Sequence, residues 1–494
     1  MTRGPKDKAS NVAPLTLPVC VVLLCLLSFV TTRSAHADDT HYRGVPVGSH
    51  PISLGGAFTG VADDASSAYH NPAGLVNHET FGLAGSLSIF AFDRSELKNV
   101  YQEGAQTDDL VADGTRNVPL FAAAVIKLGP ADKNGSKKYA LAYSVAQPIF
   151  SSGAADVSIL DGDMTDTYSI NGSDRASYYG LSFAARLNLK SSLGISWYLS
   201  VRKLTHREVG IGSDGGVLNP DTGEIIGSFV AANQSKINMR GWDFVFRLGW
   251  LYQLRDNVSI GLLVQPPGLP LKQKAEVTTQ TASGGGGVTP DRFFYLDETF
   301  DSNLPIPFET EFGVSWWPAK KFMLSMDASF HGPAPNKERI GLPPGVPPAA
   351  LGIFFPNTTQ RRPIGNAAIA ADMYVSKHVM FEVGAFTDLS AAKPIPDNPT
   401  QYFPAQINRY GVTASIAFEV AGVSLSTGAT FIYGKGDGTG AIVDLDNQLL
   451  GYVNTTAVSR LTFVHITGAT QAAQTVAKAT EQRFGKEKDP SEEP

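Results

Sequence analysis

The residues with the clearest capacity for chemistry lie close together near the N-terminus. Asp63 and Asp64 are adjacent carboxylates, and Asn71 precedes Pro72 shortly after them. An adjacent acidic pair could bind a cation, act as an acid/base pair or accept hydrogen bonds from backbone amides. We favour the last role, because no third metal ligand is recognisable nearby. For Asn71 the alternatives are an ordinary turn before proline and a role in a gating segment.

Motifs for catalysis are missing from the sequence. It contains no G-x-S-x-G elbow and no H-E-x-x-H, and its nine histidines form no cluster with metal-ligand spacing. We therefore predict that the protein is not an enzyme and holds no catalytic residue, no cofactor and no metal. A barrel hydrolase with scattered catalytic residues is the alternative that sequence motifs leave open.

Both candidate features lie in Gly55 to Leu75, which reads GGAFTGVADDASSAYHNPAGL. This stretch has too many small residues to form a packed element of its own. Gly55, Gly56 and Gly74 permit positive φ or a close backbone approach, and Pro72 fixes its own φ. Because buried backbone groups need partners, we expect a compact plug whose backbone bonds to a surrounding wall.

The first 37 residues form a predicted secretory signal. A basic start is followed by an apolar run over residues 19–30 and by Ala35-His36-Ala37, after which we expect cleavage. The alternative, an uncleaved anchor, needs about 20 apolar residues and the run is shorter. Both cysteines, Cys20 and Cys25, lie in this run, so the mature chain has none. Leu24 stands where lipoprotein processing needs a small residue, so we predict no lipid anchor.

Charge and composition narrow the class of protein further. The net charge is −6, and because the first 37 residues contribute +3, the remainder carries −9. This balance argues against a nucleic-acid partner. With 43% hydrophobic and 17% charged residues, the chain resembles neither a helical membrane protein nor a disordered one.

Alternating segments follow the glycine-rich stretch to the end of the chain. In one, Tyr139, Leu141 and Tyr143 share a face opposite small residues. Such segments occur in pairs joined by tight turns, with longer polar segments between pairs, and about fourteen can be counted, each about 9–11 residues long. We therefore predict an all-β fold, a transmembrane antiparallel β-barrel of about 14 strands with an N-terminal hatch plugging the lumen. A soluble multi-domain β protein is the alternative.

The charged residues of these segments share the face opposite the apolar one, so in a barrel they point inward. They are Lys127, Arg186, Arg202, Asp243, Arg247, Glu309, Glu311, Asp327, Asp372, Glu382 and Arg409. We expect them to form a lumenal ion-pair network that anchors the plug; a proton path is the alternative. Trp197, Trp250, Trp316 and Trp317 lie near short turns, as an interfacial aromatic girdle requires.

Seven segments are long enough to be functional loops. They span about 93–117, 147–174, 203–238, 265–305, 331–363, 388–406 and 434–456. Two carry apolar residues that could capture a ligand or simply pack locally. These candidate ligand-binding residues are Ile225, Ile226, Phe229, Val230, Phe293, Phe294 and Tyr295.

The glycine-rich stretch together with the barrel pattern resembles the FadL/TodX family of outer-membrane transporters for long-chain fatty acids and other hydrophobic compounds. The resemblance covers nearly the whole mature chain. Beyond GGAFTGVADDASSAYHNPAGL, it is carried by GWDFVFRLGWLYQLRDNVSIGLLVQPP and LPIPFETEFGVSWWP. It implies a fourteen-stranded barrel in the outer membrane of a Gram-negative bacterium, with the domains 1–37 signal peptide, 38–79 hatch, 80–467 barrel and 468–494 periplasmic tail.

The resemblance also implies a mechanism and a set of gating residues. Ligand is captured among extracellular loops and passes to a pocket near the hatch. A hatch rearrangement then opens a path, whose exit is sideways through the wall or into the periplasm, and transport is passive. The residues assigned to hatch and gating are Asn71, Pro72, Ala73, Gly74, Gly55, Gly56, Asp63 and Asp64. An outer-membrane receptor or structural barrel without hydrophobic transport is the alternative function.

The expected partners follow from this setting. They are a hydrophobic small molecule such as a long-chain fatty acid, outer-membrane lipid and lipopolysaccharide, and the barrel assembly machinery. Barrels of this type commonly end on an aromatic residue, whereas here a tail follows Ile466, so the assembly signal must be internal or atypical. The tail should combine a short helix with a charged, disordered end. We expect a monomer.

Overall fold

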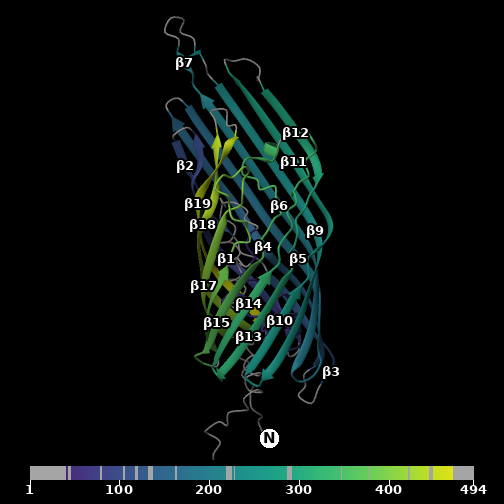
Figure 1. The fold of residues 1–494 in the computed structure, drawn as a ribbon. Coiled ribbons are helices and arrows are strands. Elements are labelled where there is room, and N and C mark those ends of the chain that lie inside the picture. Colours follow the sequence, from purple (N-terminus) through teal and green to yellow (C-terminus); the bar gives the residue numbers. More distant parts are fainter. Residues whose placement is uncertain are drawn as a thin grey trace, which may run out of the picture.

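The computed structural model describes residues 40–42, 46–77, 81–103, 106–116, 121–131, 137–161, 164–218, 225–226, 229–285, 292–346, 348–376, 378–420, 423–443 and 449–470. The predicted signal peptide and the tail beyond residue 470 lie outside them. Fourteen antiparallel strands close into a barrel, as the alternation predicted (Figure 1). In the described part of the chain, no helix is long and apolar enough to cross a bilayer.

The barrel closes where its first strand pairs with its last, from Ala84 opposite Ala469 to Leu97 opposite Ala457. Three spanning strands are each interrupted once, so seventeen segments make up the sheet. The segments are β1 (Phe81–Glu103), β2 (Gln106–Arg116), β3 (Phe121–Ala131), β4 (Lys137–Asp161), β5 (Met164–Arg186), β6 (Ser191–Asp214), β9 (Phe229–Arg255), β10 (Val258–Gln265), β11 (Leu269–Gly285), β12 (Arg292–Asp301), β13 (Glu309–Ala319), β14 (Phe322–His331), β15 (Ile364–Tyr374), β16 (Val379–Asp388), β17 (Gln406–Val420), β18 (Val423–Val443) and β19 (Leu449–Thr470).

Two of the interruptions, in β10/β11 and β12/β13, fall within the described residues, whereas the residues between β2 and β3 lie outside them. Strands β10 and β11 both pair with β9, and between them lie Pro266 and Pro267, which cannot donate to a ladder. On the neighbouring strand, β12 and β13 are separated by residues 302–308, and the amide of Gly268 donates to the carbonyl of Ile306 at 3.0 Å. The two breaks therefore lie side by side in the wall.

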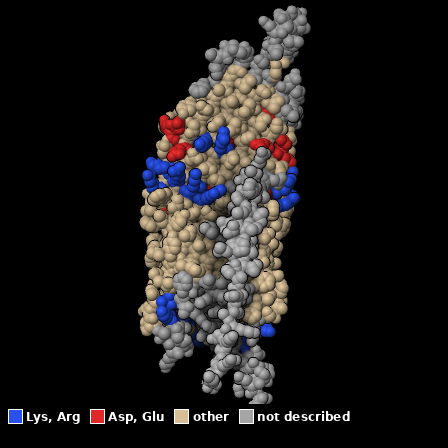
Figure 2. All heavy atoms as spheres, turned by 180° about the vertical axis from the view of Figure 1, so that it is seen from behind, with Lys and Arg blue, Asp and Glu red and all other residues tan. Residues whose placement is uncertain are grey.

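The inward face of the wall carries the charges, as predicted. Each of the eleven charged residues assigned to it from the alternation is buried or half-buried. Large apolar side chains instead cover the outside, for example Phe312, Ile369 and Phe431, each 48–49% exposed. Figure 2 shows the drawn face with a broad belt almost free of charge, bounded by a band of charged side chains above and a few below. This belt is the surface that a barrel presents to a bilayer.

Strand length differs from the sequence-based expectation. Most segments predicted as long loops are paired strand, and β9 alone runs over 27 residues. The last strand extends from Leu449 to Thr470, so it begins within the predicted loop 434–456 and continues past Ile466. The ladders continue beyond the apolar belt into segments whose buried inward face carries apolar residues such as Ile237 and Met239 and whose outward face carries polar ones such as Lys236, the reverse of the pattern in the belt. Figure 1 shows these extensions at the end opposite the N-terminus.

Two of the predicted loops remain irregular, residues 332–363 and 389–405, apart from η2 (Pro348–Leu351). The first folds back into the barrel. Its residues Ile353 and Phe354 are buried against the wall together with Tyr168 and Ile170, and Phe355 is buried with Leu204. We call residues 332–363 the inward loop.

Residues 46–77 also lie inside the barrel, near the end with the short turns. They contain α2 (His50–Ser53), α3 (Ser67–His70) and η1 (Pro72–Asn77), and nearly all of their side chains are buried. The helix η1 contacts β4, β5, β6 and β9, and α2 contacts β16, β17 and β18. We call residues 46–77 the lumenal segment.

Candidate functional site

A cavity of about 80 Å³ lies inside the barrel between the lumenal segment and the inward loop. Tyr69 belongs to the lumenal segment, while Ala334 and Thr359 belong to the inward loop. Leu304 and Ile306, from the break between β12 and β13, line its side. A second cavity of about 40 Å³ shares Tyr69 with it and reaches towards Gly55 and Gly56.

The lining combines apolar and aromatic groups with charged ones, in which three guanidinium groups outnumber the carboxylate of Glu309. Tyr178 and Ile149 contribute apolar surface, and three guanidinium groups belong to the same lining, those of Arg202, Arg339 and Arg361. Arg202 donates to both oxygens of Asp174, at 2.9 and 2.5 Å. Such a lining can bind an amphipathic molecule with an apolar body and an anionic end.

Tyr69 is held at the boundary of the two cavities. The guanidinium of Arg247 lies 4.1 Å from the centroid of its ring, a cation–π contact, and Arg247 also donates to Glu309 at 3.2 Å. Burial raises the pKa of Tyr69 well above its usual value, so the phenol stays neutral. This position therefore offers the cavity an aromatic ring and no negative charge.

The inward loop is fixed by Glu208, a buried carboxylate on β6. Its oxygens accept hydrogen bonds from the amides of Ile353 at 2.6 Å and Phe354 at 2.8 Å, and from the hydroxyl of Tyr168. Gly352 has φ +101°, and a Cβ built there would lie 2.6 Å from the Glu208 carboxylate. The loop can therefore enter the barrel at this point only with glycine.

Asn71 joins the lumenal segment to itself and to the wall. Its amide nitrogen donates to the carbonyl of Thr59 at 2.9 Å and to that of Trp250 on β9 at 3.1 Å. Its oxygen accepts from the amide of Ala73 at 3.3 Å. Pro72 and Ala73 begin η1, and both are buried. The turn is therefore present together with a wall contact, and the role of Asn71 in gating stays a prediction.

Three glycines of the wall lack the Cβ atoms that would otherwise clash with Asn71 and its neighbours in the lumenal segment. A Cβ at Gly194 would lie 2.3 Å from Pro72, one at Gly249 would lie 2.3 Å from Asn71 Oδ1, and one at Gly261 would lie 1.9 Å from the Thr59 carbonyl. The glycines come from the adjacent strands β6, β9 and β10. The sequence analysis missed them, although glycine at an inward strand position is a signal of close backbone approach.

The other predicted glycines have similar roles. Gly55 and Gly56 have φ of +57° and +90°, so they make a turn that side chains would strain. A Cβ at Gly74 would lie 2.1 Å from the Ala62 carbonyl, so the segment packs against itself there.

Charged side chains on the inward face of the wall bind the backbone of the lumenal segment, an anchoring role that we expected from their inward position. Asp327 accepts from the amides of Phe58 at 2.9 Å and Thr59 at 2.7 Å. Lys127 and Arg186 both donate to the carbonyl of Val76. These contacts attach the middle of the segment and its C-terminal end to the wall.

Asp63 and Asp64 act differently from one another. Asp64 accepts from the amides of His50 at 3.1 Å and Ser66 at 2.7 Å, which is the capping role favoured above. Asp63 instead accepts from the imidazole of His50, 2.9 Å away. The other side of that imidazole faces Asp372 and Glu382 on the wall. Burial alone would lower the pKa of His50, but Asp63 and Asp372 outweigh it and raise that pKa well above its usual value.

The predicted ligand-binding residues lie in β8, β9 and β12. Ile225–Ile226 forms β8, paired with β7 (Val217–Leu218), and the side chains of Ile225, Ile226, Phe229 and Phe293 lie outside the described set. Val230 and Tyr295 are exposed, and Phe294 packs on the cluster containing Phe355. Of these described side chains, none lines the cavity. Their role in ligand capture remains a prediction.

Solved structures with the same architecture are channels and transporters. The toluene transporter TodX of Pseudomonas putida has a TM-score of 0.57 and 12% sequence identity, covering 87% of this chain and 99% of its own. A FadL homologue of Pseudomonas aeruginosa has a TM-score of 0.55 and 14% identity, covering 90% and 100%. The toluene transporter TbuX of Ralstonia pickettii has a TM-score of 0.53 and 12% identity, covering 87% and 98%.

The chain therefore has the fold of the FadL and TodX barrels, which is an outer-membrane barrel fold. No protein-family model and no curated protein matches the sequence.

Proposed function

We propose that this protein is an outer-membrane channel of a Gram-negative bacterium for passive uptake of long-chain fatty acids or similar hydrophobic molecules. One observation carries the proposal: a cavity with apolar, aromatic and cationic lining lies inside a closed barrel, enclosed between the lumenal segment and the inward loop. A water-filled pore offers an apolar solute no favourable contacts, whereas such a lining does. The names of the similar structures, toluene transporters and a FadL homologue, support the same class of cargo.

The lining favours a fatty acid over a neutral hydrocarbon. Arg202, Arg339 and Arg361 offer guanidinium groups to a carboxylate, and the bidentate geometry of arginine suits that group. Toluene has no group that could accept a hydrogen bond from these guanidinium groups, so it would gain nothing from them. The apolar residues at the break between β12 and β13 would contact the acyl chain.

The small size of the cavity supports gating by a moving segment. Its volume of about 80 Å³ is far below the roughly 300–1,000 Å³ of pockets that bind drug-sized ligands. A long acyl chain can therefore enter only if the lumenal segment or the inward loop moves. The interrupted wall beside the cavity is the candidate for a sideways exit, and the short-turn end beyond the lumenal segment is the candidate for a periplasmic one.

Uptake of labelled oleate and labelled toluene by cells lacking their own transporter tests the proposal. Cells producing this protein should take up oleate several-fold faster than cells with an empty vector. The variant Asn71→Ala should lose most of that gain while its barrel stays folded, and Asn188→Ala, in an exposed short turn, should keep it. If neither substrate enters faster despite an assembled barrel, the transport proposal fails for these ligands and a receptor or structural barrel becomes the better account.

A further inference from the structure

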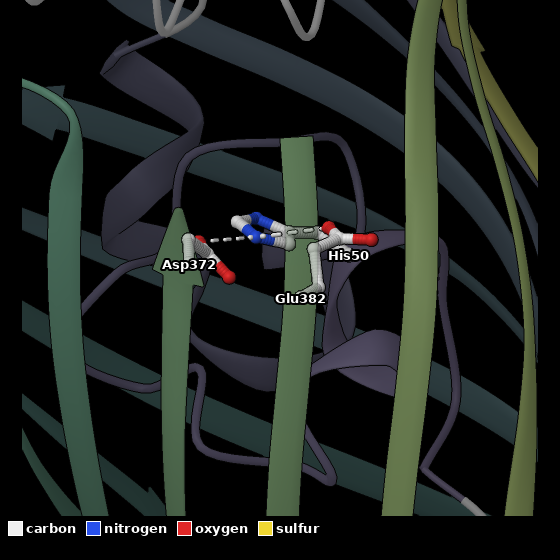
Figure 3. Close-up of side chains that lie close together, drawn as sticks. All are labelled: His50, Asp372 and Glu382. Atoms are coloured by element: carbon white, nitrogen blue, oxygen red, sulfur yellow. Dashed lines mark hydrogen bonds and ion pairs between the residues drawn. The ribbon is translucent and has the colours of Figure 1, made fainter. Parts of the chain in front are cut away.

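The imidazole of His50 lies between carboxylates of two different parts of the molecule. Nε2 lies 3.1 Å from Asp372 Oδ2 and 3.6 Å from Glu382 Oε1, while Nδ1 lies 2.9 Å from Asp63 Oδ1. Figure 3 shows Asp372 and Glu382 pointing towards His50 from neighbouring strands. The two acids face each other in the ladder between β15 and β16, and His50 begins α2 of the lumenal segment.

The two distances from Nε2 are close to those between the ligand atoms of a zinc site, so small side-chain rotations would suffice to bind an ion. Ligand atoms bound tetrahedrally to Zn²⁺ at about 2.0–2.1 Å lie roughly 3.3–3.4 Å apart. One ligand atom from each of His50, Asp372 and Glu382 lies within 4.8 Å of the others. Three ligands from the protein leave a fourth position for water or another group, as in many zinc sites.

Neighbouring side chains form the hydrogen bonds to the proposed ligands that orient metal ligands in proteins. A metal-bound histidine usually donates its other N–H to a carboxylate, and Asp63 accepts from Nδ1 of His50. Glu382 Oε2 accepts from Ser426 at 2.9 Å, and Ser426 lies 3.2 Å from Ser53 of the lumenal segment. Asp372, 2% exposed, has an oxygen, Oδ1, with no hydrogen-bond partner among the described residues.

The charges of these side chains also favour a bound cation. Asp63, Asp372 and Glu382 together carry three negative charges when ionised, and a protonated His50 offsets only one of them. Asp372 and Glu382 are 2% exposed, and buried charges without compensation are strongly unfavourable. A divalent cation on neutral His50 would reduce the net charge of the cluster to −1.

We propose that His50, Asp372 and Glu382 bind a divalent transition-metal ion, represented by Zn²⁺, that ties the lumenal segment to the wall of the barrel. Imidazole with carboxylates suits Zn²⁺, whereas Mg²⁺ and Ca²⁺ select oxygen ligands alone. The site is independent of the cargo, and it fastens the α2 end of the segment, whereas Asn71 fastens the other. The sequence predicted no metal because the ligands come from positions 322 residues apart.

The test uses the whole mature protein, without a histidine tag, in detergent. After treatment with a chelator it is dialysed against Zn²⁺ with excess Mg²⁺ and then against metal-free buffer, and bound zinc is measured by elemental mass spectrometry. Wild-type protein should keep about one zinc per chain, since structural sites with three or four such ligands bind tightly. Its melting temperature should rise with Zn²⁺ and not with Mg²⁺ alone.

Three variants locate the ion. His50→Gln, Asp372→Asn and Glu382→Gln should each lower zinc affinity at least tenfold. The control His465→Gln removes a buried wall histidine whose Nε2 pairs with Ser415, and it should retain zinc. Wild-type protein without bound zinc, displacement of zinc by Mg²⁺, or full zinc binding by Asp372→Asn and Glu382→Gln would each overturn the proposal. The zinc content of the wild-type protein tests the proposal even if a variant fails to fold.

Discussion

The side-chain amide of Asn71 donates a hydrogen bond to the backbone carbonyl of Trp250, 3.1 Å away and 179 residues later in the chain. Wall carbonyls in a sheet normally accept only from neighbouring strands, so this contact attaches the lumenal segment directly to β9. It is possible because Gly249 and Gly261 leave no side chains between Asn71 and the wall.

The wall glycines should control closure of the lumen. Gly261→Ala would place a methyl group 1.9 Å from the Thr59 carbonyl, so the lumenal segment must move away from β10. We expect larger single-channel conductance in planar bilayers than for wild type. Gly451→Ala is the matched control, because nothing lies within 4 Å of a Cβ there. Equal conductance for the two variants would show that the glycines do not determine closure.

Glu208 should control the order of the inward loop. The side chain of Gln has one acceptor oxygen and no charge, so in Glu208→Gln it cannot accept both backbone hydrogen bonds as the carboxylate does. The hydrogen bonds that hold the loop should weaken by about 1–3 kcal/mol. Hydrogen exchange at Ile353 and Phe354 should then be about 5- to 100-fold faster, because 1.4 kcal/mol corresponds to a factor of ten. Glu298→Gln, on the exposed face of β12, should leave this exchange unchanged. Unchanged protection in Glu208→Gln would exclude the carboxylate as the anchor.

The cationic lining should distinguish anionic from neutral cargo. Replacing Arg361 by Gln removes a charge from the cavity while keeping much of the side-chain volume. Loss of one charge-assisted contact of about 1.5–3 kcal/mol should lower oleate uptake roughly tenfold or more. Toluene uptake should not change, since toluene has no group for a guanidinium to bind. A parallel fall in both would mean that Arg361 supports the fold of the lining rather than the binding of a carboxylate.

Much of the barrel could be predicted from the sequence, because a membrane-spanning strand must alternate. The inward position of Arg247 and Asp372 followed from that alternation alone. The strand extensions could not be predicted in this way, because the alternation changes face beyond the apolar belt. In β9 the apolar Trp242 and Phe244 face outward in the belt, whereas in the extension Ile237 and Met239 are buried inside and Lys236 is exposed, so the pattern that identifies a membrane-spanning strand ends there.

The site was less predictable, for a physical reason. The glycine-rich stretch showed that a wall must support it, but the supporting residues depend on strand register and barrel closure. Glu208 meets Phe354, and Asp327 meets Thr59, across separations of 146 and 268 residues. No local pattern identifies such partners, and the cavity exists only where the two inserted segments approach each other.

Movement of the lumenal segment is the central claim, and a reversible tether tests it most directly. The mature chain is predicted to have no cysteine, and the hydroxyl oxygens of Ser53 and Ser426 lie 3.2 Å apart, so Ser53→Cys with Ser426→Cys should form a disulfide between segment and wall. The cells are treated with a chelator, because a bound zinc would fasten the same end of the segment. Oxidised cells should lose the oleate uptake gain and recover it on reduction, while each single variant stays active in both states. Full uptake with the disulfide formed would contradict gating by the lumenal segment.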